Sequence, residues 1–241
     1  MDRTIVITGA SRGIGLATAA AFLAAGDRVL ALYCRHPEAV EELEARYPGQ
    51  AFGYGCDLSQ RESIAPLAAH CRRLFPHVDV LVNNAGIARQ QLFVDMTARD
   101  WDELWQLHVT APIMLTQALL PDMLRRGQGH IINVSSIWGR VGASCEVAYS
   151  AAKAAVIGFT QALAKEVGLM GVRVNAIAPG VIHTDMCAHL TDDDRQALAE
   201  QTALGRLGTA QDVAGAIFLL ASPQAAYITG TVLPVDGCFM G

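Results

Sequence analysis

The chain has 241 residues, of which 52% are hydrophobic and 17% are charged, and its formal net charge is −5 at pH 7. This length suits one α/β domain around a single core, and the apolar share indicates extensive burial within that core or between subunits. The negative charge and the lack of a Lys/Arg-rich run argue against nucleic-acid binding, and no apolar run approaches the roughly 20 residues needed to span a bilayer.

The start of the chain and its cysteines indicate where the protein works. Residues 4–8 read as a strand, without separate basic and apolar regions, so we expect no signal peptide and a cytoplasmic location. The six cysteines are scattered without a CxxC pair, which predicts reduced thiols. The seven histidines show no HxxxH or HExxH spacing, so no metal site is predicted.

Short runs rich in β-branched and aliphatic residues alternate along the chain with longer amphipathic segments. Most runs are apolar almost throughout, as in strands buried on both faces of a parallel sheet. The order predicts right-handed crossovers and one Rossmann-type α/β domain over residues 1–241, a doubly wound parallel sheet of about seven strands with helices on both faces. The predicted strands are residues 4–8, 28–32, 51–56, 78–82, 130–135, 173–177 and 231–235, and one predicted helix, residues 14–25, stops at Gly26.

The stretch from Pro179 to about Gly208 breaks this alternation. It opens with Pro-Gly, has no strand signal, and contains a short helix that begins near a candidate N-cap, Thr191. Long irregular segments of this kind usually carry lids or binding loops. We therefore predict a substrate loop above the sheet at about residues 179–209.

A glycine-rich loop follows the first predicted strand and leads into a helix, with the spacing Gly-x-x-x-Gly-x-Gly. Glycines let the backbone turn tightly and approach a pyrophosphate, and a helix N-terminus offers unpaired N–H groups and a positive dipole end. The sequence therefore predicts a dinucleotide site that includes Gly9, Ser11, Arg12, Gly13, Ile14 and Gly15.

The end of the second strand distinguishes NAD from NADP. An acidic side chain there would bind the ribose 2′-OH and repel a 2′-phosphate. This chain has Tyr33 and Arg35 instead, with no carboxylate until Glu38, and Arg12 lies in the glycine loop. Two arginines at one corner predict charge-assisted bonds to a 2′-phosphate, and hence NADP(H), unless both are ordinary solvated surface residues.

Polar and small residues also follow the third and fourth strands. Asp57 and Leu58 come after the third, and Asn83, Ala85 and Gly86 come at the end of the fourth. Ligands of open α/β sheets bind at these carboxyl ends, so all five are candidates for cofactor contact. The polar ones are alternatively simple turn formers.

Tyr149 and Lys153 lie four residues apart, on one face of a predicted helix. A free phenol has a pKa near 10, and a nearby ammonium favours the phenolate and makes the group a better proton shuttle. Ser136 ends a strand thirteen residues before Tyr149, so its hydroxyl can reach the same cleft and orient a substrate oxygen. The three residues predict proton donation to a carbonyl.

Together these motifs resemble the short-chain dehydrogenase/reductase family over essentially the whole chain. The resemblance rests on residues 8–15, 83–86, Ser136, the Tyr149/Lys153 pair and Pro179-Gly180, in matching order and spacing. It implies that Ser136 orients the substrate, Tyr149 is the general acid/base, and Lys153 holds the nicotinamide ribose and tunes Tyr149. It also implies nicotinamide contacts from Pro179, Gly180, Ile182 and Thr184, and a homotetramer or homodimer built on helices over 101–126 and 148–169 and on the last strand.

One position departs from the family pattern. Many members have an asparagine in the helix before the serine strand, where it holds a water of the proton relay, and His108 stands there in this chain. His108 could carry the same relay, because imidazole both donates and accepts. It could instead be a structural histidine, or the mark of a poor enzyme.

The substrate remains open between two resemblances. The broad one is to bacterial 3-oxoacyl-acyl-carrier-protein reductases, which implies a ketone on acyl carrier protein. The narrower one, over residues 135–149 and 178–186, is to elongation factor P 5-aminopentanone reductases, whose substrate carries an amine that Glu146 or Asp185 could pair with. Trp138 and Met186 are candidates for the apolar wall, or plain core residues. A non-catalytic NADP(H)-binding sensor or scaffold is the alternative from another class.

Overall fold

Seven parallel strands form the central sheet of the computed structural model, in the order β3-β2-β1-β4-β5-β6-β9. The structure describes residues 3–184 and 191–239. The strand order reverses between β1 and β4, which defines the topological switch point where open α/β sheets bind ligands. The strands are β1 (Thr4–Ile7), β2 (Arg28–Tyr33), β3 (Ala51–Gly55), β4 (Val80–Asn83), β5 (Gly129–Val134), β6 (Val172–Pro179) and β9 (Val232–Val235). All seven predicted strands are present, with small shifts at their ends.

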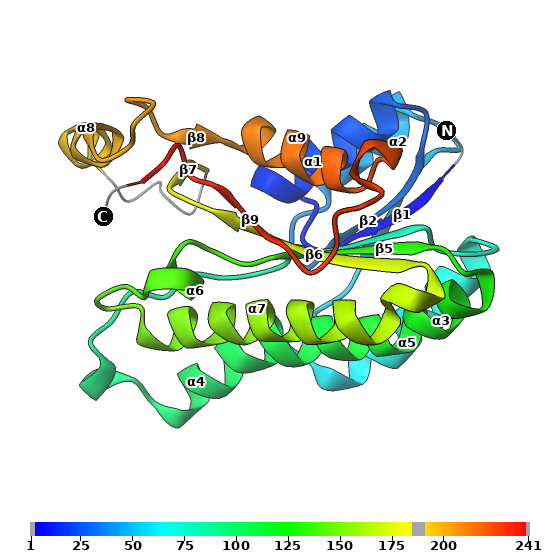
Figure 1. Cartoon of the computed structure of the whole chain (residues 1–241), viewed down its shortest axis with the longest axis horizontal. Helices are drawn as coiled ribbons and strands as arrows, with labels where there is room; N and C mark the ends of the chain where they lie inside the picture. Colours follow the sequence, from blue (N-terminus) through cyan, green and yellow to red (C-terminus); the bar gives the residue numbers. More distant parts are fainter. Residues whose placement is uncertain (1–2, 185–190, 240–241) are drawn as a thin grey trace.

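Helices cover both faces of the sheet, which confirms the predicted doubly wound α/β domain (Figure 1). Within β1, Ile5 and Ile7 pack into the core on one face and Val6 packs into the core on the other, so this strand is buried on both sides. One face carries α1 (Gly13–Ala24), α2 (Glu38–Arg46) and α9 (Ala210–Leu220); the other carries α3 (Ile64–Leu74), α5 (Ala111–Arg126) and α7 (Val147–Val167).

The long helix expected over residues 101–126 is interrupted. It consists of α4 (Ala98–Trp105), a π-helical turn (Gln106–Thr110) and α5. Pro112 lies four residues after His108, so it has no N–H to give to the His108 carbonyl, and its ring crowds that oxygen. The wider turn relieves this conflict and carries His108.

The segment after β6 contains a short strand pair that the sequence prediction missed. β7 (Ile182–His183) pairs in parallel with β8 (Gly208–Thr209). Two-residue strands show no periodicity, so a prediction without a strand signal was wrong here. The helix expected near Thr191 is present as α8 (Asp192–Glu200), and Thr191 and Asp194 form a capping box at its start. The substrate-loop role of residues 179–209 stays a prediction.

Buried ion pairs hold the amino ends of the strands, which we call the amino edge. Arg3 donates from Nε to Asp27 at 3.1 Å, and Arg126 donates to Asp79 at 2.9 Å. Asp79 also accepts from the Thr4 backbone nitrogen at 2.8 Å. Asp27 and Asp79 are 0% and 5% exposed, so each buried carboxylate has a cationic partner.

Candidate active site

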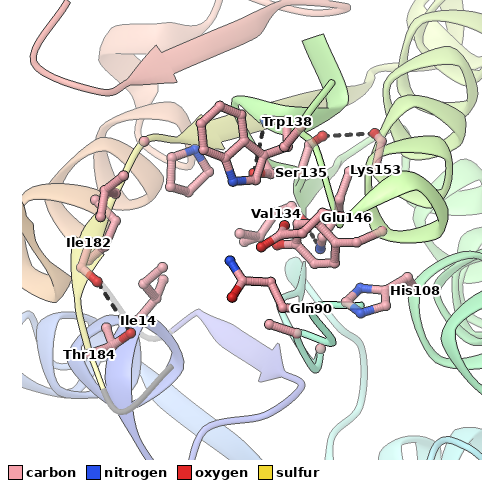
Figure 2. Close-up of a pocket in the computed structure, with 18 of the residues that line it drawn as sticks. Ile14, Gln90, His108, Val134, Ser135, Trp138, Glu146, Lys153, Ile182 and Thr184 are labelled. Carbon is pink, nitrogen blue, oxygen red and sulfur yellow. Dashed lines mark hydrogen bonds between the residues drawn. The ribbon is translucent and has the colours of Figure 1, made fainter. Parts of the chain in front are cut away.

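A cavity of about 690 Å³ opens at the carboxyl ends of the strands, the carboxyl edge, close to the switch point (Figure 2). It is bordered by residues that follow β4, β5 and β6, together with the start of α1 and α7. The predicted site residues that it brings together are Ile14, Gly86, His108, Ser136, Tyr149, Lys153, Pro179, Gly180, Ile182 and Thr184. Segments far apart in the sequence therefore meet at one cavity.

The glycine loop connects β1 to α1 on one side of this cavity. Gly13 has a φ of +53°, and a Cβ atom at Gly15 would lie 2.1 Å from the Gly9 carbonyl oxygen, so both positions need glycine. The loop rests on the segment after β4, because the Asn84 side chain donates to the Thr8 and Gly9 carbonyl oxygens at 2.9 and 3.0 Å. Helix α1 has Arg12 as its N-cap residue, with no side-chain cap hydrogen bond and no acidic residue in the first turn. Its N-terminus is therefore suited to an anion.

The residues expected near a 2′-phosphate lie on the glycine loop and at the ends of β2 and β3, and they do not line the cavity. The glycine loop lies against β2, since the Ala10 nitrogen donates to the Leu32 carbonyl at 2.7 Å. Arg35 follows β2, and Asp57 follows β3, which pairs in parallel with β2. Arg12 and Arg35 thus belong to adjacent segments of one corner.

Two of the predicted cofactor contacts, Asn83 and Leu58, are buried in the protein and do not line the cavity. Asn83 is buried, and its amide donates to Asn133 at 2.8 Å and to Thr116 at 3.2 Å. Leu58 is 6% exposed and belongs to the core. Asn84, which was not among the predicted site residues, lines the cavity instead. The alternation of side chains at the end of β4 was the signal that could have separated the two asparagines.

Tyr149, Lys153 and Ser136 line the cavity from α7 and from the end of β5. The Lys153 Nζ lies 5.6 Å from the centre of the Tyr149 ring and donates to the Val134 carbonyl at 2.8 Å. Ser136 is 7% exposed, and its Oγ accepts from the Trp138 nitrogen at 3.1 Å. The hydroxyl keeps its own hydrogen for a ligand, because an acceptor role toward Trp138 does not use it.

Burial controls the charge of Lys153. The side chain is 4% exposed, and this burial lowers the pKa of its ammonium to about 7. Ser135 fixes the turn of α7 that carries it, because the Ser135 Oγ donates to the Lys153 carbonyl at 2.8 Å. The cation is therefore held in place by two consecutive residues at the end of β5.

The family model described as enoyl-(acyl carrier protein) reductase matches residues 9–239 of the chain. The chain belongs to the short-chain dehydrogenase/reductase family. It is 40% identical over 235 residues to a 3-oxoacyl-[acyl-carrier-protein] reductase of Aquifex aeolicus, covering 96% of this chain and 95% of the relative. The same identity holds over 236 residues for a reductase of that name from Vibrio cholerae, with 98% and 96% covered. An uncharacterized oxidoreductase of Bacillus subtilis is 40% identical over 239 residues, with 98% of both chains covered.

As a member of this family the protein is an oxidoreductase, and its fold is the one that the motifs predicted. The roles of individual residues stay predictions that the cavity geometry supports. Within residues 3–184 and 191–239, no group of three or more metal-binding side chains comes together, and no helix is long and apolar enough to cross a bilayer.

Beyond the shared family motifs, the cavity has a rim formed by Gln90, Trp138 and Glu146 (Figure 2). Gln90 follows β4, and Glu146 directly precedes α7. The two loops are joined where the Gln91 nitrogen donates to the Cys145 carbonyl at 2.9 Å. The other two rim candidates from the sequence, Asp185 and Met186, lie outside the described residues.

Proposed function

We propose that the protein reduces a ketone to a secondary alcohol, with hydride from NADPH and a proton from Tyr149. The observation that carries the proposal is the meeting of Ser136, Tyr149 and Lys153 at a cavity that the dinucleotide loop also borders. The family membership supports the reaction class, because relatives with 40% identity are named as reductases.

The cofactor side of the cavity fits a dinucleotide. The uncapped start of α1 suits a pyrophosphate, and the Gly9–Gly15 contact leaves no room for side chains where that group would approach. Ile14, Pro179, Gly180, Ile182 and Thr184 border the cavity and would hold the nicotinamide end. When bound, NADPH supplies a hydride to the carbonyl carbon.

The protein's own residues handle the carbonyl oxygen. Ser136 donates its hydroxyl hydrogen to that oxygen and orients it, and Tyr149 transfers its phenolic proton to it as the alcohol forms. Lys153 stabilises the resulting phenolate through its positive charge, since its ammonium lies next to the ring and its burial strengthens the interaction.

We infer a preference for NADPH over NADH from the corner formed by Arg12 and Arg35. Neither the end of β2 nor the loop after it presents a carboxylate before Glu38 in the sequence. Two guanidinium groups can hold a 2′-phosphate by charge-assisted hydrogen bonds.

For the substrate we propose a 3-oxoacyl group on acyl carrier protein, since two of the relatives above carry that activity in their names. The segment over residues 179–209 would cover it, because Val181, Thr184 and Leu198 border the cavity. We also propose a homotetramer or homodimer, which sedimentation of the purified chain measures.

Glu146 favours a second candidate, the reduction of an aminopentanone group on elongation factor P. A carboxylate that lines the cavity is suited to an ammonium on the substrate (Figure 2). An acyl chain offers no such partner. Glu146→Gln should therefore weaken turnover of the amine substrate selectively.

The deciding experiment compares NADPH oxidation with a 3-oxoacyl carrier and with aminopentanone-modified elongation factor P. We expect turnover with the carrier substrate. Turnover with modified elongation factor P alone selects the second candidate. NADPH binding without turnover of either substrate, or of a broad panel of ketones, contradicts the reductase and supports the non-catalytic sensor.

A further inference from the structure

His108 contacts the site on two sides. Its ring stands edge-on to the ring of Tyr149, with 5.3 Å between centroids and 88° between planes. Its Nε2 lies 2.8 Å from the Ile87 carbonyl oxygen and 3.2 Å from the Ile87 nitrogen. Ile87 follows Gly86, which borders the cavity. One buried ring therefore joins the loop after β4 to α7.

Gly86 makes room for this ring. A Cβ atom at position 86 would lie 2.5 Å from Cε1 of His108 and 3.2 Å from its Nδ1, and its three nearest neighbours all belong to the imidazole. The ring has little freedom to move away, because it is 2% exposed and lies between Ile87 and Tyr149. The glycine and the histidine are sterically matched.

The Ile87 backbone engages Nε2 in either tautomer of the ring. A protonated Nε2 donates to the Ile87 carbonyl at 2.8 Å, and an unprotonated Nε2 accepts from the Ile87 N–H at 3.2 Å. Nδ1 has no hydrogen-bond partner among the described residues. Burial, together with the nearby Lys153 charge, lowers the pKa of His108 to about 3, so the ring is neutral near pH 7. Neither ring nitrogen is hydrogen-bonded to Tyr149, because Nε2 contacts the Ile87 backbone and Nδ1 has no partner among the described residues.

We propose that His108 is a positioning residue, which locks the loop after β4 against Tyr149 and transfers no proton. The inference rests on the proposed reduction, which makes Tyr149 the acid. An asparagine carries a donor and an acceptor side by side, so at this position it can bond to Ile87 without crowding Gly86. A leucine fills the space but makes no bond.

His108→Asn and His108→Leu separate positioning from proton transfer. We expect His108→Asn to keep kcat within about threefold and to keep both apparent pKa values of the pH–rate profile. His108→Leu should lose about tenfold in kcat, with the same pKa values, because Tyr149 is less well placed. A folded, NADPH-binding His108→Asn variant that loses one limb of the profile, or about a hundredfold in kcat, overturns the proposal.

Gly86→Ala tests the lock without any ketone. It should lower the midpoint of thermal unfolding by about 4 °C and weaken NADPH binding about tenfold, because the new methyl group displaces the imidazole. In the Gly86→Ala/His108→Asn double variant, at least half of both losses should be recovered. Equal losses in the two backgrounds overturn the proposal.

Gly158→Ala is the matched control for this cycle. A Cβ atom at this α7 position meets nothing within 4 Å, so the substitution should not depend on residue 108. Midpoints and NADPH affinities need no turnover. A ketone panel that gives no reduction therefore refutes the proposed function, while the cycle still decides whether His108 locks the loop.

Discussion

The two edges of the sheet hold buried charge in different ways. At the amino edge, the cations Arg3 and Arg126 meet the carboxylates Asp27 and Asp79, and the Thr4 backbone adds a hydrogen bond to Asp79. At the carboxyl edge, Lys153 donates to the Val134 carbonyl, and burial alone lowers its pKa to about 7. No carboxylate among the described residues forms an ion pair with Lys153.

This difference separates residues that stabilise the fold from residues kept for chemistry. A buried cation with a hydrogen-bonded carboxylate recovers the free energy that its desolvation costs, whereas one without a counter-charge reduces the stability of the fold. A site that retains such a cation is expected to lose stability in return for activity. Substitution of Lys153 should therefore lower turnover without lowering stability, and loss of an ion pair at the amino edge should lower stability without lowering turnover.

Tyr149→Phe should give the largest effect. Removing the hydroxyl removes the proposed acid but keeps the ring that packs against His108. We expect kcat for ketone reduction to fall about a thousandfold, with NADPH affinity within about threefold of the parent. Stopped-flow absorbance of NADPH with a saturating ketone measures the first, and fluorescence titration measures the second. A rate within tenfold of the parent would rule out Tyr149 as the acid.

Asp79→Ala should have the largest effect at the amino edge. It leaves the Arg126 guanidinium without its carboxylate and the Thr4 nitrogen without an acceptor. We expect the free energy of unfolding in urea to fall by about 3 kcal/mol, with kcat unchanged while the protein stays folded. Asp192→Asn, in an exposed pair with Arg195, is the control and should change stability by less than about 0.5 kcal/mol. A fall in kcat in the folded Asp79→Ala variant would contradict the claim that the amino edge contributes to stability and not to turnover.

Lys153→Met should raise stability while it lowers turnover. The folded pKa of Lys153 is about 7, against 10.5 for the free side chain, so the unfolded chain binds more protons between these values. The free energy that the fold loses by burying the charged Lys153 is largest below pH 7, and it disappears as the pH rises to 10.5. Without cofactor, the variant should therefore exceed the parent by about 2 kcal/mol at pH 7, and the gain should shrink towards pH 10. Urea unfolding at pH 7 and pH 10 measures it, and a gain that grows with pH contradicts a lysine destabilised by burial.

Arg12→Ala and Arg35→Ala should have the smallest effects. Each removes one proposed partner of the 2′-phosphate, so each should weaken NADPH about tenfold and leave NADH affinity nearly the same. Fluorescence titration with the two cofactors measures the difference. Equal weakening of NADPH and NADH would show that the arginines act on the fold or on the pyrophosphate instead.

The central sheet and most cavity residues could be predicted from the sequence because their signals are local. Apolar runs identified all seven sheet strands, and residue spacing brought Tyr149, Lys153 and Ser136 to one cavity. The β7–β8 pair is too short to show a period. The π-helical turn had a readable signal in Pro112, four residues after His108, which the expected continuous helix overlooked.

Tertiary packing decided the remaining points. The sequence offered Asn83 and Asn84 as neighbours, and only the pairing of Asn83 with Asn133 shows that one amide is buried while the other holds the glycine loop. His108 is a similar case, because its ring nitrogen contacts the backbone of Ile87, which lies 21 residues earlier in the chain. Such contacts between distant segments leave no periodic trace in the sequence.

Transfer of isotope from the cofactor to a ketone would show whether hydride moves at this cavity while Tyr149 supplies the proton. The protein would be given NADPH deuterated on the nicotinamide C4 and a 3-oxoacyl carrier substrate, and the alcohol would be examined by mass spectrometry. We expect one deuterium on the carbinol carbon of the product from the parent chain, and almost no product from Tyr149→Phe. An alcohol formed without deuterium from either face of the labelled cofactor would contradict hydride transfer at this cavity.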